Sequence, residues 1–124
     1  MWLFVAGGEL RSHDGGAFGA EVLDFVRQFR VDFAVQSAAA VDPRAGFLLH
    51  DLREAEFARA IIDCAEASIM AVDATKCGRS APIRLGETEL LATLVTDALP
   101  PPAIGDWLAA AGVNTVDAPS QPDP

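Results

Sequence analysis

The chain has 124 residues, of which 51% are hydrophobic, and this is enough apolar material for one domain with a single core. Its formal net charge is −9, so it lacks the excess of cations with which proteins bind nucleic acid directly. No apolar run reaches the roughly 18 residues that a membrane-spanning helix needs. Two isolated cysteines, with no histidine at metal-ligand spacing, favour neither a disulfide framework nor a zinc site. We therefore expect a cytoplasmic protein without a metal or cofactor.

The first half of the chain predicts two strands and two helices. Residues 2–6 form a continuous apolar run, which is typical of a buried strand. Residues 21–30 carry apolar side chains at helical spacing, and residues 33–35 predict a strand that leads into a long loop. Asp51 is a helix-capping residue, and the apolar residues after it recur on one helical face, which predicts a helix over 52–67.

The second half predicts two further buried strands, a helix and a last strand. The apolar runs 69–72 and 90–96 each end at an aspartate, as strands that run into turns often do. Three prolines at 100–102 favour the start of a helix, and Gly112 ends it. Residues 113–116 predict the last strand.

Continuous apolar strands that alternate with helices predict an α/β fold, with a mostly parallel sheet and helices on both of its faces. We expect one domain over residues 1–118 and a disordered tail over 119–124, which is rich in proline. In open sheets of this kind, ligands bind at the carboxyl ends of the strands. Small and polar residues follow four of the predicted strands, and this places the candidate site at that edge.

Several short segments of the chain resemble known sequence signatures. Residues 72–79 read V-D-A-T-K-C-G-R and resemble A-D-S-S-K-F-G-R, and residues 93–101 resemble T-L-I-T-D-x-x-L-P. Residues 41–46 match I-D-P-x-x-G, residues 51–55 match D-x-x-E-A, and residues 6–11 are similar to T-G-G-x-L-R. These are signatures of the DeoR family of bacterial regulators of sugar metabolism, and the chain resembles this family because the order and spacing of the segments agree over nearly its whole length.

The resemblance implies the C-terminal, effector-sensing domain of such a repressor. The fold of that domain is similar to ribose-5-phosphate isomerase, and its implied ligand is a phosphorylated sugar or a related metabolite. The family's helix-turn-helix and the first βαβ part of its sensor have no counterpart in this sequence. We therefore expect a sensor truncated on its N-terminal side, which contacts DNA only through a domain outside this chain and which forms homo-oligomers.

The candidate ligand-binding residues lie at the predicted strand ends, and they are Gly7, Gly8, Ser37, Asp42, Asp73, Thr75, Lys76 and Arg79. The ammonium of Lys76 suits a phosphate as a compact point charge, although a solvated loop lysine is the alternative. Thr75 offers a hydroxyl, and Arg79 offers either a second cation or a structural ion pair.

The remaining candidates each have a structural alternative. Asp73 either orients Lys76 or caps the turn that follows it, and Asp42 either faces the ligand or caps the loop before Pro43. Gly7 and Gly8 either let a phosphate approach backbone N–H groups or make a tight turn.

The sequence departs from the family at three positions that are usually polar. Ala39 replaces an aspartate, and Leu48 and Leu49 replace two threonines of the resembled pattern. Fewer groups are then available to hold sugar hydroxyls, so we expect an altered, less hydroxylated or lost ligand. Two other functions stay open, namely a sugar-phosphate isomerase and an oligomerisation module. Isomerisation needs a base, and Ala39 stands where an acid would be wanted, so a non-catalytic sensor is favoured over an enzyme.

Overall fold

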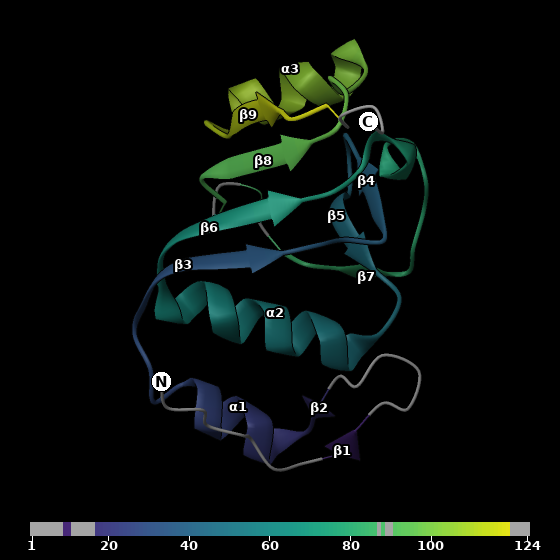
Figure 1. Ribbon diagram of the computed structural model, residues 1–124. Coiled ribbons are helices and arrows are strands. Elements are labelled where there is room, and N and C mark those ends of the chain that lie inside the picture. Colours follow the sequence, from purple (N-terminus) through teal and green to yellow (C-terminus); the bar gives the residue numbers. More distant parts are fainter. Residues whose placement is uncertain (1–8, 11–16, 87, 89–90, 120–124) are drawn as a thin grey trace, which may run out of the picture.

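The computed structural model describes residues 9–10, 17–86, 88 and 91–119 (Figure 1). Its centre is a parallel sheet with the strand order β3 (Val31–Gln36), β6 (Ala65–Ala71), β8 (Thr93–Thr96) and β9 (Asn114–Asp117). A smaller antiparallel sheet contains β4 (Ala40–Asp42), β5 (Gly46–Leu49) and β7 (Ile83–Arg84). The short strands β1 (Glu9–Leu10) and β2 (Ala17–Phe18) pair with each other. The helices are α1 (Ala20–Val26), α2 (Leu52–Cys64) and α3 (Pro102–Ala110), with a 3-10 turn, η1, at Ala74–Lys76.

Helix α2 begins and ends where local chemistry and sheet pairing dictate. A carboxylate oxygen of Asp51 accepts a hydrogen bond from the backbone N–H of Arg53 at 2.7 Å, which caps the helix as expected. The helix ends at Cys64, not at residue 67 as the pattern predicted, because Ala65 already pairs with Val31 and Ala67 with Phe33 in the parallel sheet. Tertiary pairing therefore overrides local helix propensity at this end.

The small antiparallel sheet replaces much of the long loop that the sequence predicted. Strands β4 and β5 form a hairpin in which Ala40 lies opposite Leu48, and β7 adds to β5 with Arg84 opposite Leu48. The predicted strand at 90–96 begins only at Thr93. The predicted strand at 2–6 and residues 120–124 of the tail predicted over 119–124 lie outside the described residues.

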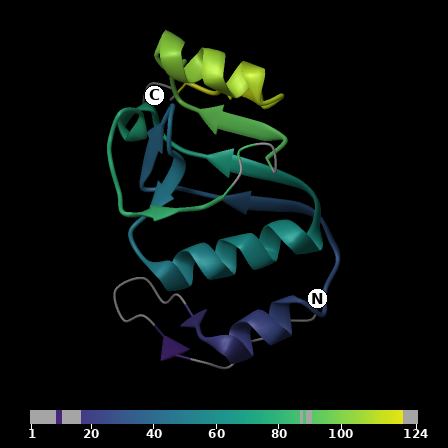
Figure 2. The same cartoon turned by 180° about the vertical axis from the view of Figure 1, so that it is seen from behind.

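The α/β class and the parallel main sheet are confirmed, and the buried core lies on one face of that sheet. Met70 and Leu94 are fully buried and lie opposite each other on β6 and β8. The apolar faces of α2 and α3 and the small sheet join the same cluster, which includes Ala55, Ile62, Ile104, Leu108, Val41 and Phe47. Figures 1 and 2 show α2 next to β3 and α3 next to β9.

The other face of the main sheet is open in the part of the chain that the structure describes. Phe33 and Val35 on β3 are 65% and 67% exposed, and Val31 and Val116 are also exposed. The expected helix cover on this second face is not found among the described residues, because α2 and α3 both contribute to the cluster on the first face. Because alternate residues of a strand point to opposite faces, Ala34 on β3 is buried between its exposed neighbours.

Candidate functional site

The loops that follow β6 and β8 meet at the carboxyl edge of the main sheet. The two strands are parallel, with Ala71 opposite Val95, so both chains leave the sheet on the same side. The carboxylate of Asp97, just after β8, accepts a hydrogen bond from the backbone N–H of Ala74 at 2.7 Å. This bond fixes the loop after β6 against the loop after β8, a role that the sequence pattern did not reveal.

Asp73 caps the short turn η1. Its Oδ1 atom accepts hydrogen bonds from the hydroxyl of Thr75 and from the Thr75 backbone N–H, the latter at 3.0 Å. These bonds, the hydroxyl's above all, lower the pKa of Asp73, and the positive charges of Lys76 and Arg79 lower it further. The carboxylate is therefore ionised at neutral pH. Of the two roles considered for Asp73, the turn cap is the one that hydrogen bonds support.

The η1 loop carries the cations of the site. Lys76 is half-buried and Arg79 is exposed, and Cys77 lies between them along the loop. Burial raises the pKa of the Cys77 thiol, and the carboxylates of Asp73 and Asp97 raise it further. The thiol therefore stays protonated at neutral pH, which disfavours it as a nucleophile.

The hairpin of the small sheet is attached to the same loop. The backbone N–H of Gly78, which has a φ of +82°, donates to the carbonyl of Val41 at 2.9 Å, and Val41 also forms a β-bridge with Cys77. Asp42 follows Val41 directly, so the topology brings this residue close to the η1 loop.

Asp42 itself makes the hairpin turn. Its Oδ1 atom accepts from the backbone N–H groups of Arg44 at 2.7 Å and Ala45 at 2.9 Å. These bonds lower the pKa of the Asp42 carboxyl, and the nearby guanidinium groups of Arg44 and Arg84 add to the effect. The capping role expected as an alternative for Asp42 is therefore present.

The other candidate residues are less closely tied to this cluster. Ser37 is exposed and follows the last residue of β3, at the same edge of the sheet. Gly7 and Gly8 lie outside the described residues. Leu48 and Leu49 are buried on β5, and the carbonyl of Leu48 accepts from the backbone N–H of Ala39 at 2.9 Å. Two of the three positions that depart from the family pattern thus pack apolar side chains in the interior.

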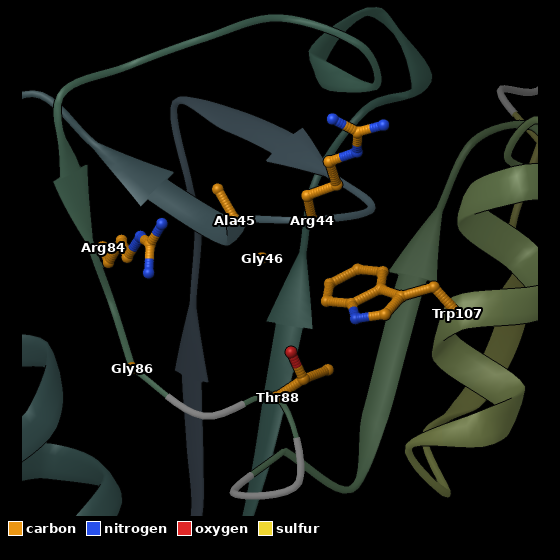
Figure 3. A pocket seen from close by; sticks show the side chains of 7 residues that line it. All are labelled: Arg44, Ala45, Gly46, Arg84, Gly86, Thr88 and Trp107. Carbon is orange, nitrogen blue, oxygen red and sulfur yellow. The ribbon is translucent and has the colours of Figure 1, made fainter.

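A pocket of about 350 Å³ lies beside the hairpin turn, and no sequence motif indicated it. Its walls come from the turn, from β7 and the residues after it, and from α3, and Figure 3 labels the lining residues: Arg44, Ala45, Gly46, Arg84, Gly86, Thr88 and Trp107. The run Asp42-Pro43 followed by Gly46 was a usable hairpin signal, because Asp, Pro and Gly are common turn residues. The pairing of β7 with this hairpin has no comparable local signal.

The residues of the η1 loop, Asp73 to Arg79, lie at the carboxyl end of β6 and form what we call the strand-end site. This site contains groups that suit a phosphate or another small anion. An ammonium, a hydroxyl and a guanidinium occur within five residues of one loop, on the half-buried Lys76 and on the exposed Thr75 and Arg79. No group of three or more His, Cys, Asp or Glu side chains among the described residues could hold a metal ion. No helix in the described part of the chain is long and apolar enough to cross a membrane.

Comparison with known proteins identifies the family. The model of the DeoR C-terminal sensor domain matches residues 1–98, which is well over half of the chain. The chain belongs to this family. It is 38% identical over 102 residues to the glycerol-3-phosphate regulon repressor of Escherichia coli K12, which covers 82% of this chain and 40% of the repressor.

Two further relatives agree with the assignment to the DeoR family. The HTH-type transcriptional repressor CsqR of Escherichia coli K12 is 33% identical over 114 residues, which cover 92% of this chain and 44% of CsqR. The glycerol-3-phosphate regulon repressor of Haemophilus influenzae is 36% identical over 98 residues, covering 79% and 38% respectively. The chain thus spans about two fifths of the length of these relatives. The resemblance seen in the sequence motifs is confirmed, and the chain is a sensor domain of the type found in DeoR-family transcriptional repressors.

Proposed function

We propose that this DeoR-type sensor domain binds a phosphorylated sugar or a similar small phosphorylated metabolite at the carboxyl edge of its main sheet. The observation that carries the proposal is the η1 loop, where Lys76 is held half-buried next to Thr75 and Arg79. Two relatives are named as repressors of a glycerol-3-phosphate regulon, and this favours a short phosphorylated polyol as the ligand. Asp42, Ser37, Gly7 and Gly8 complete the proposed site.

Lys76 is the only lysine of the chain, and this makes a direct test possible. An amine-acylating reagent should modify Lys76 and the N-terminus, and glycerol 3-phosphate should protect Lys76 selectively. Peptide mass spectrometry gives the extent of modification at each amine. Unphosphorylated glycerol serves as the control ligand and should give no protection.

Calorimetric titration tests the same contact through affinity. We expect Lys76→Ala to weaken binding of glycerol 3-phosphate roughly tenfold to a hundredfold, the range typical of one charge-assisted contact. Arg27→Ala is the matched control, because Arg27 is an exposed cation at the end of α1. Equal affinities of wild type and Lys76→Ala for glycerol 3-phosphate and for ribose 5-phosphate would refute the site.

We propose further that the domain binds its effector without catalysis. Aldose–ketose isomerisation needs a base next to the carbonyl. Ala39 supplies none in the connection between β3 and β4, and the Cys77 thiol is protonated because its pKa is raised. An isomerase assay with ribose 5-phosphate should therefore detect no turnover above the protein-free rate. Turnover that scales with protein and falls in Lys76→Ala would contradict this proposal.

We also propose that the sensor domain associates with a second copy through the open face of its main sheet. Phe33, Val35 and Val116 expose apolar side chains on this face, and their burial against an equivalent face would be favourable. Charged residues are scarce there, so two net-acidic copies could approach with little repulsion. Sedimentation velocity should show a concentration-dependent dimer that Phe33→Ser weakens, and a monomer at every concentration would refute it.

Contact with DNA is proposed to belong to another domain of a complete regulator. The formal net charge of −9 disfavours direct binding of the phosphate backbone by this chain. A regulator of this type would act in the cytoplasm, where bacterial DNA resides.

A further inference from the structure

The pocket beside the hairpin turn concentrates positive charge in a chain that is strongly acidic. Two of the nine basic residues of the whole sequence, Arg44 and Arg84, line it, and no carboxylate is among its described lining residues. The described acid Asp42 interacts electrostatically with both guanidinium groups, and its Oδ1 atom accepts hydrogen bonds from the backbone N–H groups of the turn. Within the described residues, no hydrogen bond or ion pair joins a carboxylate to either guanidinium.

The framework that presents these two arginines is well fixed. Arg59 on α2 donates from Nε to the carbonyl of Leu85 at 2.7 Å and from Nη2 to the carbonyl of Arg84 at 2.6 Å, which anchors β7 to the helix. The backbone N–H of Leu85 in turn donates to the carbonyl of Phe47 at 3.0 Å. The Arg84 side chain therefore extends from a strand that is held on both sides, and Arg44 extends from the turn that Asp42 holds.

The rest of the pocket combines a polar group with a planar apolar wall. Trp107 of α3 is half-buried, and its ring packs against Phe47 with 5.6 Å between centroids, so the indole has a defined orientation. Figure 3 shows Arg84 and Trp107 on opposite sides of Gly46 and the hydroxyl of Thr88 directed toward Gly46, whereas the guanidinium group of Arg44 extends away from Thr88.

Gly46 keeps this space open. A Cβ atom built on it would come within 3.5 Å of the Thr88 hydroxyl and 3.7 Å of the indole of Trp107. Its φ of +83° is also a conformation that residues with a side chain rarely adopt. Glycine therefore both makes the turn and leaves the space between the Thr88 hydroxyl and the Trp107 indole unfilled.

We propose that this pocket is a second ligand site, which takes an anion with a planar group, such as a mononucleotide. Arg44 and Arg84 would pair with the phosphate, because the guanidinium group matches phosphate oxygens in a two-pronged geometry. The indole of Trp107 would stack on the planar ring. A volume of about 350 Å³ is in the range of small-molecule pockets. The site differs from the strand-end site in its cations, since Lys76 and Arg79 are not among its lining residues.

The test uses the full chain and adenosine monophosphate as the probe. The sequence has two tryptophans, Trp2 and Trp107, so a Trp2→Phe background leaves Trp107 as the only indole reporter. Adenosine monophosphate should change the Trp107 fluorescence in a saturable way, and calorimetry should give the same dissociation constant. Adenosine lacks the phosphate group and inorganic phosphate lacks the planar ring, so each should bind at least tenfold more weakly than adenosine monophosphate.

Variants assign the binding to this pocket. Arg84→Gln and Arg44→Gln should each weaken adenosine monophosphate binding roughly tenfold or more, whereas the exposed control Arg27→Gln and the strand-end variant Lys76→Ala should leave it unchanged. Circular dichroism checks the fold of each variant. Conversely, Arg84→Gln should leave glycerol 3-phosphate binding unchanged, so failure of this proposal can be distinguished from failure of the strand-end site.

Four results would overturn the proposal. They are no saturable binding of adenosine monophosphate at millimolar concentration, equal affinities of wild type and both folded arginine variants, a loss of binding in Lys76→Ala as large as in Arg84→Gln, and adenosine binding as tightly as its monophosphate. The third result would place the nucleotide at the strand-end site, and the fourth would remove the role of the arginines.

Discussion

The same substitution made on the buried and on the open side of the molecule should have very different effects on stability. Val41 is fully buried in the core cluster, whereas Val35 is 67% exposed on the open face of the main sheet. Replacing either residue by threonine keeps the β-branched shape and exchanges a methyl group for a hydroxyl. Val41→Thr buries that hydroxyl among apolar side chains and should lower the free energy of unfolding by about 1–3 kcal/mol. Val35→Thr leaves it in water and should change that free energy by less than about 0.5 kcal/mol.

Urea unfolding followed by circular dichroism measures both variants, at a protein concentration low enough to keep the wild type monomeric. The wild-type stability of a domain this size is expected to be about 5–15 kcal/mol, so a loss of 1–3 kcal/mol shifts the midpoint clearly. If Val41→Thr and Val35→Thr lower the free energy of unfolding equally at low protein concentration, another part of the chain covers the open face. A loss in Val35→Thr that appears only at high concentration would instead indicate that a second copy covers it.

Three further predictions follow from charge and titration. The isolated chain should not shift duplex DNA in a gel at micromolar protein, because its formal net charge is −9, and a salt-sensitive shift would contradict this. The pKa values of Asp42 and Asp73 are lowered in the folded state, so their ionised carboxylates stabilise the fold. This stabilisation is fully present above the pKa that each carboxyl has in the unfolded chain, and it is lost as the pH falls through the lower pKa of the folded state. Unfolding free energies should therefore be level near neutral pH and fall below about pH 4, and Asp42→Asn with Asp73→Asn should flatten that fall. The pKa of Cys77 is raised, so iodoacetamide should alkylate the Cys77 thiol at pH 8 more slowly than it alkylates the thiol of free glutathione. Asp73→Asn removes a negative charge near the thiol and should speed the alkylation of Cys77. Alkylation of Cys77 faster than that of glutathione would be inconsistent with the burial of the thiol.

Local sequence patterns predicted most of the regular elements. The cap at Asp51, the apolar run before Asp73 and the helix that ends before Gly112 are confirmed, because capping, strand apolarity and helix-ending glycine depend on near neighbours. The family was also predictable, since its motifs are short runs whose order and spacing can be read directly. The η1 loop was placed correctly at the carboxyl end of a parallel strand, because that position follows from the α/β pattern alone.

Other features depend on segments that are distant in the sequence. Residues 65–67 continue an apolar helical pattern, yet pairing with β3 makes them a strand. Strand β7 has only two residues, and it forms because β5 offers an edge and Arg59 holds its carbonyl groups. The hydrogen bond from Ala74 to Asp97 likewise joins loops that are 23 residues apart.

By itself the sequence determined the fold class, the family and the loop that carries Lys76, since each of these rests on local order and spacing. The tertiary structure decided that the described helices α2 and α3 bury one face of the main sheet and leave Phe33 and Val35 exposed. It also decided that Arg44, Arg84 and Trp107 line one pocket, although they are separated by up to 63 residues in the chain. Helical and strand periodicity specify which side of an element is apolar, but they do not specify which distant element covers it, because that depends on pairing and packing of the whole chain.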